Sequence, residues 1–398
     1  MGISGDVEIG RLGGDEDAQT YMAIASHALF FPPVDLSEWF RREGPENARV
    51  ARVGGRIVGG LTMQRMGQWF GGRSVPMTAV RVVAVAPEHR ATGVASRLIR
   101  SALEEIHASG APLSVLYPAT QPIYRRQGYE QAGVRMRYRV PLRSVSIRER
   151  ELDVRAIEPA DQTAIRAVYA ERARRTAGNL DRSDWYWDRI FVPPAWGDPV
   201  HGYVTCGDDG VEGYVVYSQG RPDASLHDYE MQLVDLVFTT ARAGRRLLTM
   251  LVDHRSMAAS MTYWAAPADP LLIVMTEQLR SVDQRIDWML RIVDVPGALE
   301  ARGYPVGVAA ELHFDVSDDV LPANNRRFTM EVSGGAARVR KGGRGDLKID
   351  VRGLAPLYSG HLSVRELQST GYVNGSEDAL AAAGAIFAGP APWMPDIF

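Results

Sequence analysis

The apolar positions in the first third of the chain change their period at one junction. Residues 75–85 are rich in β-branched side chains, which is typical of a strand, and Pro87 bars this strand from continuing inside a sheet. From Gly93 the apolar positions recur every three or four residues, which predicts an amphipathic helix that ends near Gly110. Other elements are predicted as follows: a helix over 19–31, a hairpin of strands 48–53 and 57–63, strands over 113–117 and 135–142, and a short helix beginning at Pro122.

The second third of the chain repeats this mixed α/β order. The predicted elements are a helix over 160–176, a hairpin of 203–206 and 213–218, a strand over 232–238 and a helix over 245–257. An internal duplication explains the repeated order most simply, although few residues are identical.

The last third has a different order, which predicts a separate α+β domain. Its strand-like segments are 312–316, 328–332 and 348–351, and its helix-like segments are 363–369 and 377–387. We therefore expect α/β and α+β folds in three domains, over residues 1–142, 143–286 and 287–398.

Length and composition agree with this division. At about 150 residues to a domain, 398 residues correspond to two or three domains. The net charge of −3 gives no overall positive charge for non-specific binding, so nucleic acids and anionic membranes are not expected as partners. The single cysteine, Cys206, excludes an internal disulfide, and the sequence has neither a signal-peptide pattern nor a run of about 18 apolar residues. We expect a cytoplasmic protein.

The junction between the β-branched strand and the helix has the composition of a phosphate-binding turn. A helix N-terminus presents amides without partners in the helix, and its dipole favours an anion. Gly93 and Ala95 leave room for phosphate oxygens near the backbone. The pattern Arg90-x-x-Gly93-x-Ala95 resembles the acetyl-coenzyme A signature of GNAT acyltransferases, although the same short pattern also arises by chance in helices.

This resemblance implies acetyl-coenzyme A as co-substrate. It places the pyrophosphate on Arg90, Ala91, Thr92, Gly93, Val94 and Ala95, and the peptide-like pantetheine arm along the backbone of Val83 and Val85.

A second motif, Ile123-Tyr124-x-x-x-Gly128-Tyr129, resembles the GNAT turn that carries a tyrosine beside the coenzyme sulfur. The resemblance implies that Tyr124 is the general acid. A phenol with a pKa near ~10 is a suitable proton donor to a departing thiolate. Packing of Tyr124 on Tyr129 in the core is the alternative.

The whole chain resembles the Eis family of bacterial N-acetyltransferases, in which two GNAT domains precede a domain like a sterol carrier protein. Residues 288–296 and 356–360 are similar to segments of that third domain. The resemblance implies that the terminal carboxylate, here on Phe398, enters the first domain and acts as general base. Alternatively, the apolar tail packs only on its own domain. Family members can carry an acidic residue just before the last Phe, where this chain has Ile397, with Asp396 one position earlier.

The second junction departs from the signature. Ala241 replaces the basic residue and Arg246 the small one, so we expect one coenzyme site per chain, in the first unit. Motifs of zinc hydrolases and serine esterases are absent, and no metal is expected. Trp39 and Tyr117 are candidates for the wall of the substrate pocket, with core packing as the alternative for both.

The expected function is transfer of an acetyl group from acetyl-coenzyme A to a primary amine by direct attack in a ternary complex. The resemblance implies aminoglycosides, polyamines or lysine side chains as acceptors, and a homo-oligomer, with a hexamer as one form. A non-catalytic acyl-coenzyme A or lipid-binding protein is the competing hypothesis.

Overall fold

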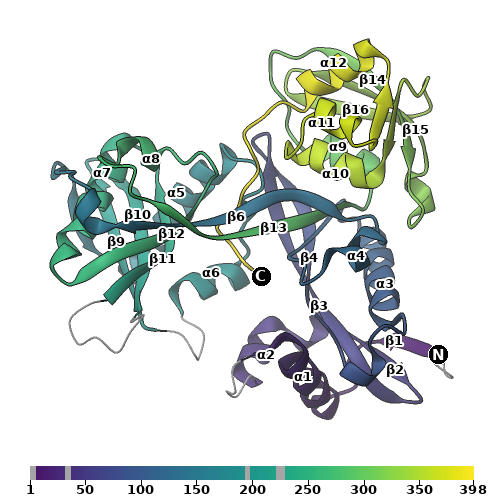
Figure 1. Cartoon of the computed structure of the whole chain (residues 1–398), viewed down its shortest axis with the longest axis horizontal. Coiled ribbons are helices and arrows are strands. Elements are labelled where there is room, and N and C mark those ends of the chain that lie inside the picture. The colour runs from purple at the N-terminus through teal and green to yellow at the C-terminus, as the bar shows by residue number, and fades with distance from the viewer. Residues whose placement is uncertain (1–5, 32–36, 193–197, 221–228) are drawn as a thin grey trace. The chain divides into compact units, whose positions relative to one another are not determined.

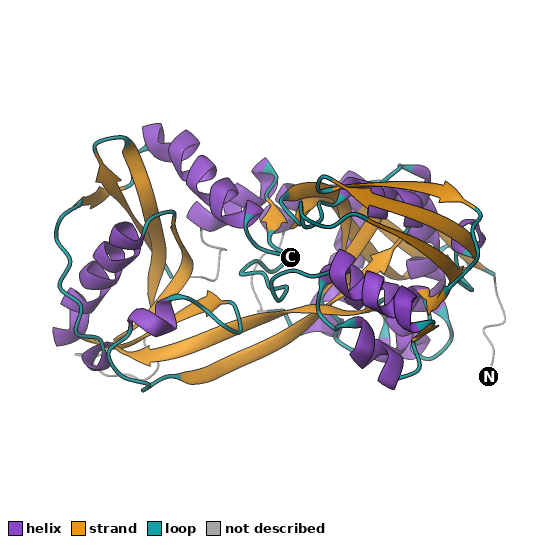
Figure 2. Ribbon diagram, turned by 90° about the horizontal axis from the view of Figure 1, so that it is seen from above, coloured by secondary structure: helices purple, strands orange, loops and turns teal. Residues whose placement is uncertain are grey.

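The chain forms two units, and each unit is built from segments that are separated in the sequence. The computed structural model describes residues 6–31, 37–192, 198–220 and 229–398 (Figures 1 and 2). Unit 1 contains the chain up to Gly133, residues 287–390 and the last two residues. Unit 2 contains residues 134–286 and 391–396.

The first sheet of unit 1 surrounds the predicted junction. Its strand order is β1-β2-β3-β4-β5-β13, with β4 antiparallel to β3 and parallel to β5. The strands are β1 (Val7–Gly10), β2 (Ala48–Val53), β3 (Arg56–Phe70), β4 (Arg73–Val85), β5 (Leu113–Leu116) and β13 (Ser281–Ile292). The predicted hairpin is confirmed, with left-handed Gly54 and Gly55 at its turn, although β3 is longer than the pattern indicated.

Four helices accompany this sheet. They are α1 (Asp15–Leu29), α2 (Ser37–Glu43), α3 (Val94–Ala108) and α4 (Gln121–Arg125). The amphipathic helix predicted after Gly93 is α3, and the apolar stripe it buries supplies most of its stability. Its buried residues are Val94, Leu98, Ile99, Ala102, Leu103 and Ile106. Pro122 lies in the first turn of α4, as predicted.

The C-terminal part of unit 1 is an α+β fold. Its sheet has the order β16-β15-β14-β17-β18, from β14 (Ala310–Ser317), β15 (Arg326–Ser333), β16 (Ala336–Lys341), β17 (Leu347–Asp350) and β18 (Val373–Gly375). Its helices are α9 (Val295–Ala301), α10 (Val351–Ser359), α11 (Val364–Ser369) and α12 (Glu377–Ile386). The sequence pattern missed α10 because Pro356 lies inside it.

Strand β13 enters this unit from unit 2. Residues 289–292 pair antiparallel with residues 113–116 of β5, and Val293 N donates to Pro112 O at 2.8 Å. The sequence pattern assigned this segment to the third domain. In the structure it extends the sheet of the first.

Unit 2 repeats the mixed order. Its sheet runs β6-β12-β11-β10-β9-β7, from β6 (Glu130–Pro141), β7 (Asp153–Ala156), β9 (Val200–Gly207), β10 (Gly210–Gly220), β11 (Tyr229–Phe238) and β12 (Ala258–Ala265). The helices are α5 (Gln162–Arg174), α6 (Asp184–Phe191), α7 (Ala241–Val252) and α8 (Leu271–Val274), and β8 (Leu180–Asp181) is a two-residue strand. The predicted helix over 245–257 is wrong in its start, because Thr240 caps α7 four residues earlier and its hydroxyl accepts from Ala243 N.

Candidate active site

The turn between β4 and α3 opens the N-terminus of α3. Gly93 is the N-cap, in the left-handed region with φ of 91°, and no side chain caps the helix. The first bond of the helix runs from Arg97 N to Gly93 O at 3.1 Å, so the amides of residues 94–96 have no partner in the helix. A Cβ at residue 93 would meet no atom within 4 Å. This open cradle of amides suits a pyrophosphate.

The six residues predicted to bind the coenzyme, 90–95, form one continuous turn that leads into α3. A short 3₁₀ turn, Pro87–His89, precedes them, and the Thr92 hydroxyl donates to His89 O at 2.5 Å. Ala91 has φ of 60°, a conformation that costs a residue with a Cβ about 1–2 kcal/mol. Local strain of this kind is often found at ligand sites.

The end of β4 supplies backbone groups beside this turn. Pairing of β4 with β5 stops at Ala79 and Val115, and β4 continues alone on that side to Val85. Ala86 N donates to Val58 O of β3 at 2.9 Å. Because successive residues of a strand direct their amides to opposite sides, Val85 presents its N–H and C=O away from β3. Beyond Ala79, β4 therefore has no ladder pairing with β5, and this unpaired stretch includes Val83 and Val85.

A bulge interrupts the regular pairing of β4 with β3 at Val82 and Val83. Two residues of β4, Val82 and Val83, lie opposite Leu61 alone, and Val82 has φ of 49°. The fully buried Tyr21 of α1 donates its hydroxyl to Val82 O at 2.7 Å. Sequence reasoning missed Tyr21, because a bond across 61 residues leaves no local pattern.

Tyr124 lies in a buried setting on α4. Its ring makes an edge contact with Tyr129 at 6.1 Å between centroids, and the Tyr129 hydroxyl is 2.7 Å from Ser114 Oγ. The Tyr124 hydroxyl makes no hydrogen bond within the described residues. Only 6% of the surface of Tyr124 is exposed to solvent. Burial raises the pKa of Tyr124 to about 12. The side chain thus packs on Tyr129, and its hydroxyl remains protonated and available to donate.

The structure brings two other predicted residues together. The ring of Phe398 lies 5.3 Å from the ring of Tyr117, measured between centroids, at an interplanar angle of 55°. Tyr117 directly follows β5, and both residues belong to unit 1. The last residue of the chain is therefore near the end of the strand from which β4 diverges.

The charge of Asp396 is paired with an arginine. Its carboxylate is buried in unit 2 and accepts from Arg182 Nη2 at 2.6 Å and from Tyr169 Oη at 3.2 Å. The carboxylate of Asp396, which lies one position earlier than the acidic residue of the Eis pattern, is thus neutralised by Arg182. Arg182 is 214 residues from Asp396, so no local sequence pattern identifies it as the partner.

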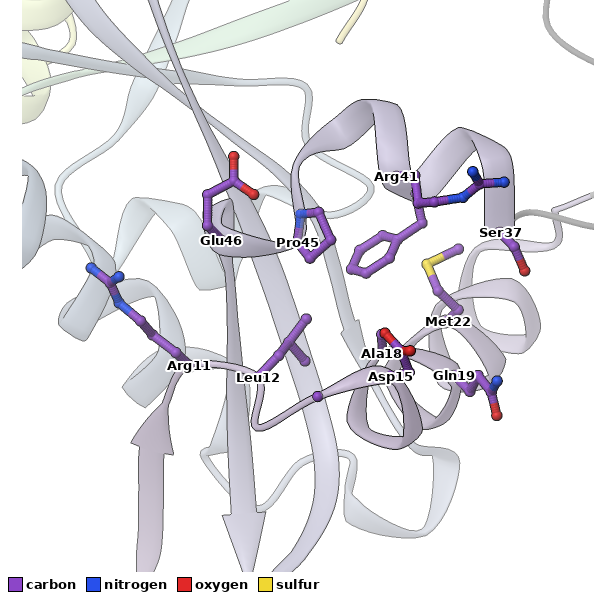
Figure 3. Close-up of a pocket in the computed structure, with 12 residues that line it drawn as sticks. Arg11, Leu12, Asp15, Ala18, Gln19, Met22, Ser37, Arg41, Pro45 and Glu46 are labelled. Carbon is purple, nitrogen blue, oxygen red and sulfur yellow. The ribbon is translucent and has the colours of Figure 1, made fainter.

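Trp39 lies on α2, and its side chain is outside the described residues. The neighbouring Phe40 is buried and packs against Tyr21, with 6.0 Å between ring centroids. Phe40 also faces a cavity of about 660 Å³ between the start of α1, α2 and the segment before β2 (Figure 3). The residues lining this cavity are Arg11, Leu12, Gly14, Asp15, Ala18, Gln19, Met22, Ser37, Phe40, Arg41, Pro45 and Glu46. None of the predicted coenzyme or catalytic residues lies among them.

The second junction has no cradle of the same kind. Only Thr239 and Thr240 separate β11 from α7, whereas eight residues separate β4 from α3. An ion pair between Arg242 and Glu212 lies across the start of α7, and Arg242 also binds Glu151 at 2.9 Å. The loop that would surround a pyrophosphate is missing, and side chains of this chain occupy the start of the helix.

The part of the chain that the structure describes contains no group of three or more His, Cys, Asp or Glu side chains that could hold a metal ion. No helix within these residues has the length and apolar character needed to cross a membrane.

Comparison with known families and structures agrees with these geometries. Residues 11–132 and 178–292 each match an acetyltransferase (GNAT) domain, and residues 295–395 match a sterol carrier protein domain. An uncharacterized N-acetyltransferase of Streptomyces griseus is 31% identical over 349 residues, which cover 82% of this chain and 83% of that protein.

Solved structures give the same result over the full chain. A GCN5-related N-acetyltransferase from Anabaena variabilis is 35% identical with a TM-score of 0.94, covering 99% of this chain and 100% of its own. Eis1 from Mycobacterium abscessus is 27% identical with a TM-score of 0.81, at the same coverage of both chains. The open cradle on α3, the two repeated folds and these relatives together show that the chain is an enzyme of the Eis family of GNAT N-acetyltransferases.

Proposed function

We propose that this acetyltransferase moves an acetyl group from acetyl-coenzyme A to a primary amine by direct attack in a ternary complex. The observation that carries the proposal is the uncapped N-terminus of α3 beside the diverging end of β4. The amides of residues 94–96 hold the pyrophosphate, and the backbone of Val83 and Val85 pairs with the pantetheine arm. The amide at Val83 also faces the developing charge on the thioester oxygen.

Proton transfer in this proposal uses two residues of unit 1. The acceptor amine arrives largely as an ammonium ion and gives its proton to the carboxylate of Phe398, directly or through water. Its lone pair then attacks the thioester carbonyl. As the C–S bond breaks, Tyr124 donates its proton to the thiolate, and the products are an amide and free coenzyme A.

The acceptor belongs to the polyamine-like class in this proposal, which includes aminoglycosides, polyamines and lysine side chains. The test is release of free thiol from acetyl-coenzyme A with spermidine, an aminoglycoside and a lysine peptide, each against a reaction without acceptor. Saturable, acceptor-dependent release is expected. Absence of release with all three amines would reject this acceptor class.

We expect Gly93→Leu to weaken acetyl-coenzyme A binding by roughly tenfold or more, equal to at least about 1.4 kcal/mol. The leucine side chain occupies the open space before the amides of α3, and φ of 91° disfavours any residue with a Cβ. Calorimetric titration measures the Kd. Gly110→Leu is the matched control, because Gly110 lies at the other end of α3 with φ of 79° and open surroundings. Equal affinity of both variants and wild type would contradict the cradle.

Coenzyme binding is expected at one site per chain. The second junction lacks the loop of the first, so Arg242→Ala removes its ion pairs without creating a site. Titration should give a stoichiometry near one for wild type and for Arg242→Ala. A second equivalent of bound coenzyme in the wild type would contradict this assignment.

We also propose three domains, over residues 1–142, 143–286 and 287–398. The matched regions 11–132, 178–292 and 295–395 support three domains, although the middle match runs to residue 292 and unit 2 already begins at Val134. The protein works in the cytoplasm, in keeping with its single, unpaired Cys206. It forms a homo-oligomer, for which light scattering of the purified chain is the test.

A further inference from the structure

Strand β11 of unit 2 has the features that make β4 a coenzyme-binding strand in unit 1. β11 pairs in parallel with β12 as far as Gln232 and Thr262, and continues alone on that side over residues 233–238. An extra residue, Val234, forms a bulge between the pairs Tyr217–Leu233 and Val216–Asp235. Unit 2 therefore has a diverging pair of strands with a bulge, although its junction cannot seat a pyrophosphate.

The C-terminal segment of the chain pairs with a strand close to this divergence. Val134 of β6, the strand next to β12, donates its N–H to Pro392 O at 3.2 Å and accepts from Met394 N at 3.1 Å. Trp393 and Met394 are buried, and the Trp393 ring belongs to the hydrophobic core of unit 2. The segment, whose backbone is yellow in Figure 1, thus pairs with a strand and buries apolar side chains.

Further bonds to the tail backbone come from two other segments of unit 2. Trp393 N donates to Ala177 O at 2.9 Å, and Asn179 Nδ2 donates to Trp393 O at 2.7 Å. On β6, Arg135 Nε donates to Pro395 O at 2.7 Å. Polar groups of unit 2 therefore contact four consecutive residues, 392–395, which is more than a frayed terminus requires.

A buried ion cluster fixes the far end of the segment to β11. The guanidinium of Arg182 binds Asp235 of β11 through Nη1 at 2.5 Å and Asp396 through Nη2 at 2.6 Å. All three side chains are 0–1% exposed. Tyr214 and Tyr169 donate to the two carboxylates at 2.7 and 3.2 Å. Because Arg182 binds both acids, the tail spans from β6 to the diverging part of β11.

We infer that unit 2 is a receptor for the C-terminal segment: the divergence that holds a coenzyme in unit 1 holds residues 392–396 in unit 2 and so positions Phe398. Two residues span at most about 7 Å, so a fixed Asp396 confines Phe398 to a small volume. The benefit to catalysis rests on the proposed role of Phe398 as base. Asp396 and Arg182 are then positioning residues, which act through the chain that follows them.

The test compares full-length wild type with Asp396→Asn, which removes one charge from the cluster and leaves the Arg182–Asp235 pair intact. Release of Phe398 by a carboxypeptidase, followed by mass spectrometry, should be roughly tenfold faster in the variant because the segment opens more often. The kcat should fall by roughly tenfold or more, with the KM for acetyl-coenzyme A unchanged, because only the position of the base is lost.

Asp161→Asn is the matched control. Asp161 is another buried carboxylate of unit 2 and binds Arg155 through both oxygens at 2.7 Å, with no part in the tail cluster. Neither the release rate nor kcat should change in this variant. A general loss of stability in unit 2 would change the release rate and kcat of Asp161→Asn and of Asp396→Asn alike.

Trp393→Leu is the second test variant, because it loosens the same segment without disturbing a buried charge. If Asp396→Asn fails to fold, this variant carries the test alone. Release of Phe398 at the wild-type rate in every folded variant would overturn the receptor assignment. Faster release with unchanged kcat would overturn the positioning role. The release rate is measurable even if the wild type shows no turnover, in which case the proposed function fails independently of the receptor.

Discussion

Deletion of Phe398 should lower kcat by about 10²–10⁴-fold, the range usual for loss of a general acid or base. The deletion moves the terminal carboxylate back by one residue, to Ile397, away from the position beside Tyr117. An α-carboxylate in water is a weak base, with a pKa near 3.3–3.7, so the proposed role requires a site that excludes water from it. Because residues 90–95 are unaltered, the Kd of acetyl-coenzyme A should stay within about twofold. Steady-state kinetics and calorimetric titration measure the two quantities.

Two controls separate the carboxylate of Phe398 from its ring. Phe398→Ala retains a carboxylate at residue 398 and loses the contact with Tyr117, so kcat should fall by only about tenfold. A short C-terminal tag retains the ring and removes the carboxylate from this position, and should be as damaging as the deletion. Full activity of the tagged chain would eliminate the carboxylate as base.

Tyr124→Phe should lower kcat by about 10²-fold or more and change coenzyme affinity little, because the lost hydroxyl acts on the departing sulfur. Burial raises the pKa of Tyr124 to about 12, above the value near 10 of a free phenol. A phenol with a raised pKa remains protonated as the pH increases, until the pH approaches that pKa. The Tyr124-dependent part of kcat should therefore persist from about pH 6 to about pH 10 and be lost only near pH 12.

Tyr129→Phe is the matched control for Tyr124. Tyr129 is fully buried and packs on the ring of Tyr124. The Tyr129 hydroxyl is hydrogen-bonded to Ser114 and is therefore not available to a substrate. Its loss should reduce stability, by about 1 kcal/mol for one buried hydrogen bond, and leave the pH dependence of kcat in place. An unchanged kcat in Tyr124→Phe, or an equal loss in both variants, would remove Tyr124 as the acid.

Locally encoded parts of the fold could be predicted from the sequence. The stripe of α3 repeats every three or four residues, and Gly54-Gly55 lies at the hairpin that it predicts, so both elements follow from a few neighbouring residues. The turn over residues 90–95 was predicted in the same way, because small residues at fixed offsets precede a helix. The open space around Gly93 in the structure agrees with the small residues of this turn.

Parts of the candidate site that depend on distant residues could not be predicted. Tyr21 and Val82 are 61 residues apart, and Arg182 and Asp396 are 214 residues apart, and no local pattern identifies such partners. Helix α10 was missed for the opposite reason. Pro356 is a local signal against a helix, and nearly complete burial of residues 351–359 overrides it.

The pairing of β13 with β5 has a consequence for synthesis of the chain. On the ribosome, β5 is complete at Leu116, yet its partner residues 289–292 emerge only after all of residues 134–286. Until then the edge of β5 lacks the antiparallel neighbour it has in the finished protein, and an unpaired edge of this kind favours association with other chains. The sheet that contains β4 and β5 therefore closes late, through a contact of high sequence separation that forms slowly.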